Sequence, residues 1–495
     1  MDSRPPKDGS AGEDFRGNDA FCKSPHLAIR LILFAALVLL LPHILLAAPP
    51  KIGLTPPLKF SPGVPERVVL KNGAVVYLLE DHELPLINLS VELKGSPAYE
   101  SPKIAGVIEI FEEVWRAGGT KTRSPSILNQ ILEQNAISVE TSADLESASV
   151  SLNCLTKNWA KGLEIFTDVL RNPRFDGKQL SLAKARAIEA LKRKNDTPGG
   201  IARRAFRDVM YGKTHVYARQ ATKATLALIG KNDLAELHKK IAVPNGAIFS
   251  VSGDFKRDEL LEALEASLKD WKPAGQTPAK FDFSLKKPPE GRIFFVEKNF
   301  NQSRVVMGEM GISRHSPDHF PLEVANYILG EGGTSRLFAD IRSRMGLAYV
   351  VGSFYTEPEG PGLAGVGGQT KAESTLQIIS AFENELKKFT GEEPSAEEMG
   401  TAKDSILNSF IFRFNSPARI VAEKASLEFY GYPSDYLDNY PANVSRVSPG
   451  QVLEAAKKYF SVDQMKITVV GNKSKFGGSL DKFGKVVVIP LKDID

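Results

Sequence analysis

The chain has 495 residues, which is too long for a single hydrophobic core and suits two or three domains. Hydrophobic residues make up 42% of it and charged residues 25%, as is ordinary for a soluble globular protein. The formal net charge of +4 is small and the basic residues are interspersed with acidic ones, so the composition gives no support for nucleic-acid binding.

The N-terminal region differs in composition from the rest of the chain. Residues 1–26 are polar and rich in Gly, Asp, Ser and Pro, which predicts a disordered segment. An apolar run then extends to Ala48, and its uninterrupted part, Leu31–Leu41, is shorter than the roughly 20 residues of a membrane span. We interpret residues 27–48 as a signal peptide or a membrane anchor. The protein is therefore expected to be exported, and to be periplasmic or anchored in the membrane facing the periplasm.

The two cysteines lie on either side of this apolar run. Cys22 precedes it, so Cys154 is alone in the part of the chain expected to be exported. An intrachain disulfide cannot form there, and stability must come from a large core. Cys154 lies in an alternating pattern typical of a strand, which favours a place in that core.

After a Pro-rich lead at residues 49–65, the first half mixes strand and helix signals. Residues 67–79 predict a hairpin around Asn72-Gly73, because Asn-Gly suits a tight turn. Alternation predicts further strands at 86–93, at 247–252, and two within 138–155. Apolar positions at helical spacing predict helices at 102–116, 124–134, 159–170, 177–194, 201–210 and 233–241.

The second half repeats the motif order of the first. Three motifs recur at offsets of 219, 214 and 218 residues: MYG at Met210–Gly212 and FYG at Phe429–Gly431, the turns Gly119-Thr120 and Gly333-Thr334, and the strand-ending glycines Gly253 and Gly471. Such similar offsets predict an α+β protein of two homologous tandem domains, each a mostly antiparallel sheet packed against helices. Prolines mark the boundary between them, and the predicted segments are a first domain at 66–270, a linker at 271–291, a second domain at 292–480 and a C-terminal tail at 481–495.

Residues 327–355 carry the most distinctive pattern of the second half. A helical end runs into Gly330, Gly332 and Gly333, a new helix follows from Ser335, and a strand is predicted after Gly346. Two polar residues stand out, Arg342 in the last helical turn and Tyr349 at the start of the strand. On spacing alone, Arg342 is predicted to interact with the C-terminal carbonyl groups of the helix, and Tyr349 is predicted to be a half-buried strand aromatic.

This stretch resembles the second-domain signature of the pitrilysin/insulinase family of zinc peptidases, which includes mitochondrial-processing-peptidase-like proteins. It shares the glycine-rich turn, an SRLF helix start and a GLAY strand start, and the resemblance spans about residues 60–475. The resemblance implies that Arg342 and Tyr349 are the family's R/Y pair. This pair holds the substrate carbonyl and stabilises the charge that develops on it. The resemblance also implies that Gly330, Gly332 and Gly333 contact substrate.

In active relatives, the first-domain helix before the glycine turn carries HxxEH, which binds zinc and activates water. Here that helix reads GVIEIFEEVWRAGGT, so Glu109 and Glu113 fall at the histidine positions and Glu112 at the base position. The third ligand position falls at Ala183, with Glu189 nearby. Catalytic zinc sites nearly always include imidazole, so we interpret the three carboxylates as a solvated helix face and expect this chain to bind no metal.

Three functions remain open. The favoured hypothesis is an exported subunit, inactive alone, that lends Arg342 and Tyr349 to a partner subunit carrying HxxEH and zinc, in a heterodimer that cleaves unfolded peptides. A second is a structural or peptide-binding homologue without a catalytic role, like the respiratory-complex core subunits that share this fold. A third is a self-sufficient metalloendopeptidase with an atypical metal site.

Overall fold

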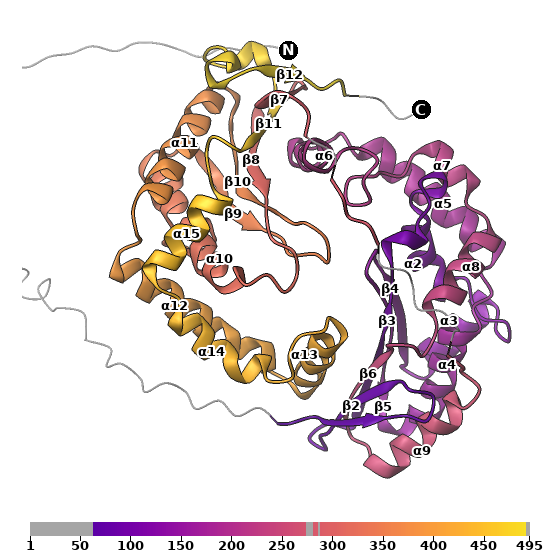
Figure 1. Ribbon diagram of the computed structural model, residues 1–495. Coiled ribbons are helices and arrows are strands. Elements are labelled where there is room, and N and C mark those ends of the chain that lie inside the picture. Colours follow the sequence, from indigo (N-terminus) through magenta and orange to yellow (C-terminus); the bar gives the residue numbers. More distant parts are fainter. Residues whose placement is uncertain (1–62, 274–280, 286–287, 492–495) are drawn as a thin grey trace, which may run out of the picture. The chain divides into compact units, whose positions relative to one another are not determined.

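The structure, a computed structural model, describes residues 63–273, 281–285 and 288–491 (Figure 1), all within one of the chain's two structural units. The predicted disordered segment and the predicted signal peptide or anchor lie outside the described residues, as does nearly all of the Pro-rich lead. Among the helices that are described, none combines the length and the apolar character needed to cross a membrane.

The first half is built on a six-stranded sheet in the order β1-β2-β6-β3-β5-β4. The predicted hairpin is formed by β1 and β2, and every neighbouring pair in the sheet is antiparallel except β2 and β6. The strands are β1 (Glu66–Val69), β2 (Val75–Glu80), β3 (Leu86–Lys94), β4 (Ser138–Ala143), β5 (Ser147–Leu155) and β6 (Ile248–Gly253).

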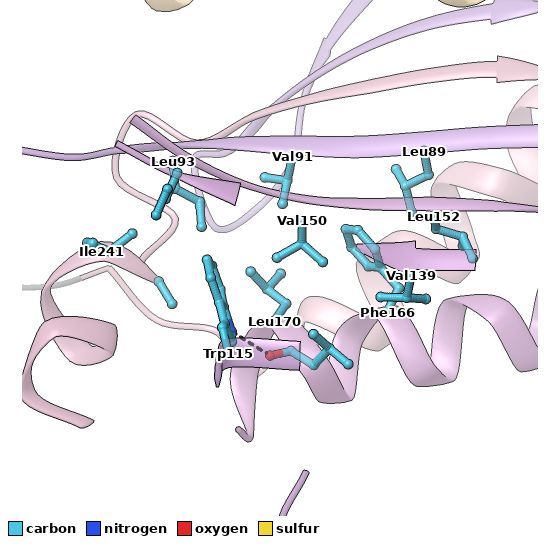
Figure 2. Packing of buried hydrophobic residues seen from close by; sticks show 14 of the residues in the cluster. Leu89, Val91, Leu93, Trp115, Val139, Val150, Leu152, Phe166, Leu170 and Ile241 are labelled. Carbon is cyan, nitrogen blue, oxygen red and sulfur yellow. Dashed lines mark hydrogen bonds between the residues drawn. The ribbon is translucent and has the colours of Figure 1, made fainter. Parts of the chain in front are cut away.

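Helices cover one face of this sheet, and the hydrophobic core of the first half lies between these helices and the sheet. Alternate residues of β3 point into the core, where Figure 2 shows Leu93 and Val91 near Trp115 of α2. Cys154 is buried there as a free thiol. The helices are α2 (Val107–Ala117), α3 (Pro125–Gln134), α4 (Trp159–Arg171), α5 (Gly177–Arg193), α6 (Pro198–Tyr211), α7 (Lys223–Leu228), α8 (Lys231–Ile241) and α9 (Arg257–Leu268).

The helix predicted at 102–116 is divided at Gly106. This residue has φ +94°, and a Cβ there would lie 2.7 Å from the Cβ of Ala221. Glycine adopts this positive φ without strain and has no Cβ to clash with Ala221. The chain therefore turns here, between a short 3₁₀ turn, Pro102–Ile104, and α2. The structure also contains α7 and α9, which the sequence analysis did not predict.

The second half has the same sheet architecture, in the order β12-β7-β11-β8-β10-β9. The parallel pair β7 and β11 repeats the parallel pair β2 and β6, which confirms the two tandem α+β domains. Residues 486–488, expected in the C-terminal tail, form an edge strand beside β7. The strands are β7 (Ile293–Glu297), β8 (Gln302–Met310), β9 (Ala348–Tyr355), β10 (Leu363–Lys371), β11 (Lys466–Gly471) and β12 (Val486–Val488).

Helices again pack on one face of the second sheet. Of two π-helical turns, η4 (Tyr327–Glu331) contains Gly330, and η5 (Phe338–Arg344) follows the glycine-rich stretch. The α-helices are α10 (His319–Asn326), α11 (Thr375–Gly391), α12 (Ala396–Phe410), α13 (Pro417–Phe429), α14 (Tyr436–Arg446) and α15 (Pro449–Tyr459).

Each sheet also receives a helix from the other half of the chain. Helix α6 packs on β8 and β11, where the ring of Phe206 meets that of Phe354 edge-on at 6.2 Å. Helix α13 packs on β2 and β6, where Glu428 accepts two hydrogen bonds of 2.7 Å from Arg67 and one of 2.6 Å from Tyr77. The two domains are therefore interlocked through these helices, although their sequence segments do not overlap.

The imidazole of His238 on α8 should make the stability of the first half depend on pH. It lies among aromatic rings, 5.7 Å from that of Trp115, and its Nε2 is 2.8 Å from the Leu170 carbonyl oxygen. Burial lowers the pKa of His238 from 6.5 to about 4. Below pH 6.5 the unfolded chain therefore takes up a proton that the folded chain resists. The free energy of unfolding should fall by roughly 3 kcal/mol between pH 6.5 and 4 because of this residue.

Urea unfolding of the wild type and of His238→Gln at a series of pH values checks this expectation. Glutamine does not titrate, so the variant should lose less stability than the wild type over the same range. Parallel curves for the two proteins would show that His238 is not the group responsible.

Candidate functional site

The structure brings Arg342 and Tyr349 together at the surface of the second half. The guanidinium carbon of Arg342 lies 5.0 Å from the centre of the Tyr349 ring and 4.7 Å from that of Phe338. Both predicted residues are exposed, and Tyr349 shows 79% of its surface to solvent. Tyr349 is thus not a half-buried strand aromatic. Stacking on two rings orients the guanidinium while leaving its N–H donors available.

Local backbone geometry explains how this pair is presented. Arg342 lies in η5, where the Met345 amide donates to the Asp340 carbonyl at 2.9 Å, five residues back. The helix ends at Arg344, and the chain turns at Gly346, which has φ +62°. Such π turns occur mostly as single turns and frequently at functional sites. Tyr349 follows near the start of β9, which is an edge strand that pairs with β10 alone among the described strands.

The predicted substrate-binding glycines do not share one role. A Cβ on Gly330 would lie 2.1 Å from the Ser353 amide nitrogen, so glycine is required for η4 to pack against β9. A Cβ on Gly332 would meet the Tyr327 ring at 2.7 Å, whereas Gly333 faces open space. Packing therefore accounts for Gly330 and Gly332, and Gly333 is the glycine left accessible.

The three carboxylates of α2 have different surroundings. Glu113 forms a 2.7 Å ion pair with Arg186 of α5, and Glu112 accepts a 3.3 Å hydrogen bond from Ser142. Glu109 is exposed, but the protein atoms crowded around it disfavour its charged form and raise its pKa. Glu112 and Glu113 are thus each engaged by a different side chain.

The residues of α5 do not complete a metal site either. Ala183 is buried, and Glu189 pairs with Lys192 at 2.6 Å on its own helix. Arg186 instead directs a positive charge at Glu113, where a cation would have to bind. Within the described ranges, no group of three or more His, Cys, Asp or Glu side chains is placed to hold a metal ion. The residues present do not fit a catalytic zinc.

A mostly half-buried polar cluster in the second half was not anticipated from the sequence. His319 Nδ1 lies 2.9 Å from Glu357, its Nε2 lies 3.2 Å from the hydroxyl of Tyr436, and Tyr440 donates to Glu323 at 2.5 Å. Burial raises the pKa of Glu323. Burial opposes a rise in the pKa of His319, but the hydrogen bond to Glu357 and the charges of Glu357 and Glu323 together raise it. It joins three segments far apart in sequence, 319–323, 357 and 436–440, so no local motif could have indicated the cluster.

Comparisons with known proteins agree with this architecture. Residues 77–220 match the family described as Insulinase (Peptidase family M16), and residues 229–406 match the Peptidase M16 inactive domain. A relative in Helicobacter pylori, named "Non-peptidase homolog YmxG", is 22% identical over 401 residues, covering 80% of this chain and 91% of that protein.

Two solved structures share the fold. One is a peptidase M16 inactive domain from Pseudomonas fluorescens, with a TM-score of 0.73 and 24% identity, covering 83% of this chain and 98% of that one. The other is the periplasmic protease PqqL from Escherichia coli, with a TM-score of 0.71 and 15% identity, covering 83% of this chain and 47% of PqqL.

Proposed function

Because this chain belongs to the insulinase family of peptidases, family M16, we propose that it is the zinc-less subunit of an exported metallopeptidase. It supplies Arg342 and Tyr349 to the active site of a partner subunit that carries HxxEH and holds the zinc. The observation that carries the proposal is the solvent-exposed contact of these two side chains in a chain whose α2 helix does not fit zinc.

The chemistry of the pair suits the stabilisation of a peptide carbonyl under attack by water. Arg342 keeps its positive charge under all ordinary conditions, and the Tyr349 hydroxyl is a neutral donor. Both groups can donate to an oxygen as negative charge develops on it, and donors of this kind make a large contribution to the rate of acyl transfer. The test is peptide cleavage by the co-expressed complex with wild-type chain, Arg342→Ala or Tyr349→Phe.

The substrates proposed are unfolded peptides that bind as an added strand. In the described part of the chain, each sheet has two edge strands with one neighbour only, and β4 in the first half and β9 in the second lie at corresponding edges. Such edges offer backbone N–H and C=O groups to an extended peptide, and alternate side chains then give specificity. The position of Tyr349 on β9 places the proposed catalytic donor beside one of these edges.

The name of the Helicobacter pylori relative favours a second candidate, a peptide-binding homologue without a catalytic role. In that case Arg342 and Tyr349 are passive, and changing either leaves the turnover of any partner intact. The same substitutions therefore separate the two functions. Export is proposed on the N-terminal apolar run, and the fold shared with periplasmic PqqL is compatible with it.

Metal analysis tests the remaining possibility, a self-sufficient metallopeptidase. The chain purified alone should contain far less than one zinc per molecule and should not cleave unfolded peptides. The reason is that Glu113 forms an ion pair with Arg186 and no imidazole lies on α2. An HxxEH-carrying family member, prepared in the same way, serves as the positive control. Stoichiometric zinc together with proteolysis by this chain alone would overturn the proposal.

A further inference from the structure

A cavity of about 900 Å³ lies beside α6, over the face of the second sheet that carries this helix. Its walls come from α6, β8, β9 and β10, and include the rings of Phe206, Phe354 and Tyr217. A cavity of this size, with apolar walls and a few polar groups, is typical of a ligand site. Neither the R/Y pair nor the carboxylates of α2 line it.

Three arginines converge on this cavity. Arg203 and Arg207 lie one turn apart on α6, and Arg304 lies on β8 opposite Gln369 of β10. A Cβ at position 367 would lie only 3.0 Å from an Arg304 guanidinium nitrogen, so Gly367 leaves room for that group. Burial, together with the charge of Arg203, lowers the pKa of Arg304. The site therefore concentrates positive charge at a partly desolvated position.

No carboxylate of the described residues lies within 4.0 Å of these three guanidinium groups. Arg304 is half-buried. Among the other half-buried arginines, some bind carboxylates (Arg123 to Asp168 at 2.7 Å, Arg219 to Glu100 at 3.1 Å and Arg314 to Glu146 at 2.6 Å), whereas Arg171 and Arg204 donate to backbone carbonyl oxygens. Of the described residues around the cavity, only Glu357 is acidic, and its carboxylate pairs with His319. Partly buried charges normally have partners, so Arg304 lacks an anion that a ligand could supply. The exposed Arg203 and Arg207 line the same cavity and add positive charge to it.

We propose that this cavity binds a carboxylate carried by an unfolded peptide, either an acidic side chain or the C-terminal carboxylate. Arg304 donates to it from the sheet, and Arg203 and Arg207 donate from α6. Phe206 and Phe354 contact the apolar residue next to it. The proposal rests on the proposed function in that it takes the ligand to be a peptide, and it adds a preference for negative charge. Planar guanidinium groups suit a carboxylate because they can donate two parallel hydrogen bonds.

Binding of three labelled peptides to the purified chain alone, measured by fluorescence anisotropy, tests the proposal. The first is Ala-Ala-Phe-Glu-Ala-Leu with a free C-terminus, the second has Gln in place of Glu, and the third has a C-terminal amide. The wild type should bind the first at least about tenfold more tightly than one of the other two, as expected for a charge-assisted hydrogen bond. The weaker of the two identifies the carboxylate that is bound. Equal affinity for all three would overturn the proposal.

Two variants locate the effect in the cavity. Arg304→Gln and the double variant Arg203→Gln/Arg207→Gln should each remove the preference for the charged peptide. The double variant changes only exposed side chains, so it tests the site even if Arg304→Gln impairs folding. Arg193→Gln, an exposed arginine of α5 outside the cavity, is the matched control and should keep the preference. A preference that survives the double variant would place the binding elsewhere.

This experiment can fail independently of the proposed function. It measures binding to the isolated chain, whereas the proposed function is measured as cleavage by the complex with Arg342 changed. Charge-independent peptide binding, together with loss of cleavage in Arg342→Ala, would remove the carboxylate site and leave the proposed function standing.

Discussion

Replacing Arg342 by alanine should slow peptide cleavage by the proposed heterodimer about 10²–10³-fold, as loss of one preorganised oxyanion donor does. In barrier terms this is about 2.7–4 kcal/mol. Arg342 is exposed and stacks on two rings, so its loss should not unfold the chain. The effect should fall mainly on kcat, because the donor acts on charge that is present only in the transition state. Steady-state kinetics on purified complexes measure it.

Two further variants make this result interpretable. Tyr349→Phe removes only the hydroxyl and should also lower kcat, since the ring that supports Arg342 is kept. Arg344→Ala is the matched control, because Arg344 is exposed, lies in the same helical turn and pairs with Asp340 at 3.1 Å. It should leave kcat nearly unchanged. Full activity of both Arg342→Ala and Tyr349→Phe would count against a catalytic role and favour a peptide-binding homologue.

Replacing Trp115 by alanine should lower the free energy of unfolding by about 3–5 kcal/mol, the range for large aromatic side chains in cores. The side chain is fully buried between α2 and the first sheet (Figure 2), with its ring 4.8 Å from that of Phe111. Its Nε1 donates to the Val169 carbonyl at 2.9 Å. The substitution therefore leaves a cavity and a buried carbonyl without its partner. Urea unfolding followed by far-UV circular dichroism measures the loss.

Trp159→Ala provides the matched control for this prediction. Trp159 begins α4 and is only partly buried against the same core, so its removal should cost clearly less. Trp115→Phe separates the two causes, because it keeps most of the volume and loses the hydrogen bond. Equal losses for Trp115→Ala and Trp159→Ala would mean that burial at position 115 does not govern the stability of the first half.

Much of the fold could be predicted because its signals are local. Asn72-Gly73 makes a tight turn wherever two alternating strands flank it, and β1 and β2 pair there. The alternation in β3 matches its buried and half-exposed positions. The repeated motifs predicted two alike domains, and five strands of each sheet follow one order, β2-β6-β3-β5-β4 and β7-β11-β8-β10-β9. No local pattern predicted β12, which is held in place by β7, a strand nearly 200 residues earlier in the chain.

The candidate site also has one part that the sequence determined and another that only the tertiary structure decided. The sequence alone determined that no imidazole lies on α2 and that an arginine and a tyrosine stand seven residues apart near a glycine turn. The tertiary structure decided that these two side chains touch and face solvent, and that Arg186 neutralises Glu113 across 73 residues of sequence. It also brought Arg304 to the helix that carries Arg203 and Arg207. The physical reason is that periodicity reports which face of its own element a residue occupies, whereas electrostatics depends on distances between elements, which packing alone sets.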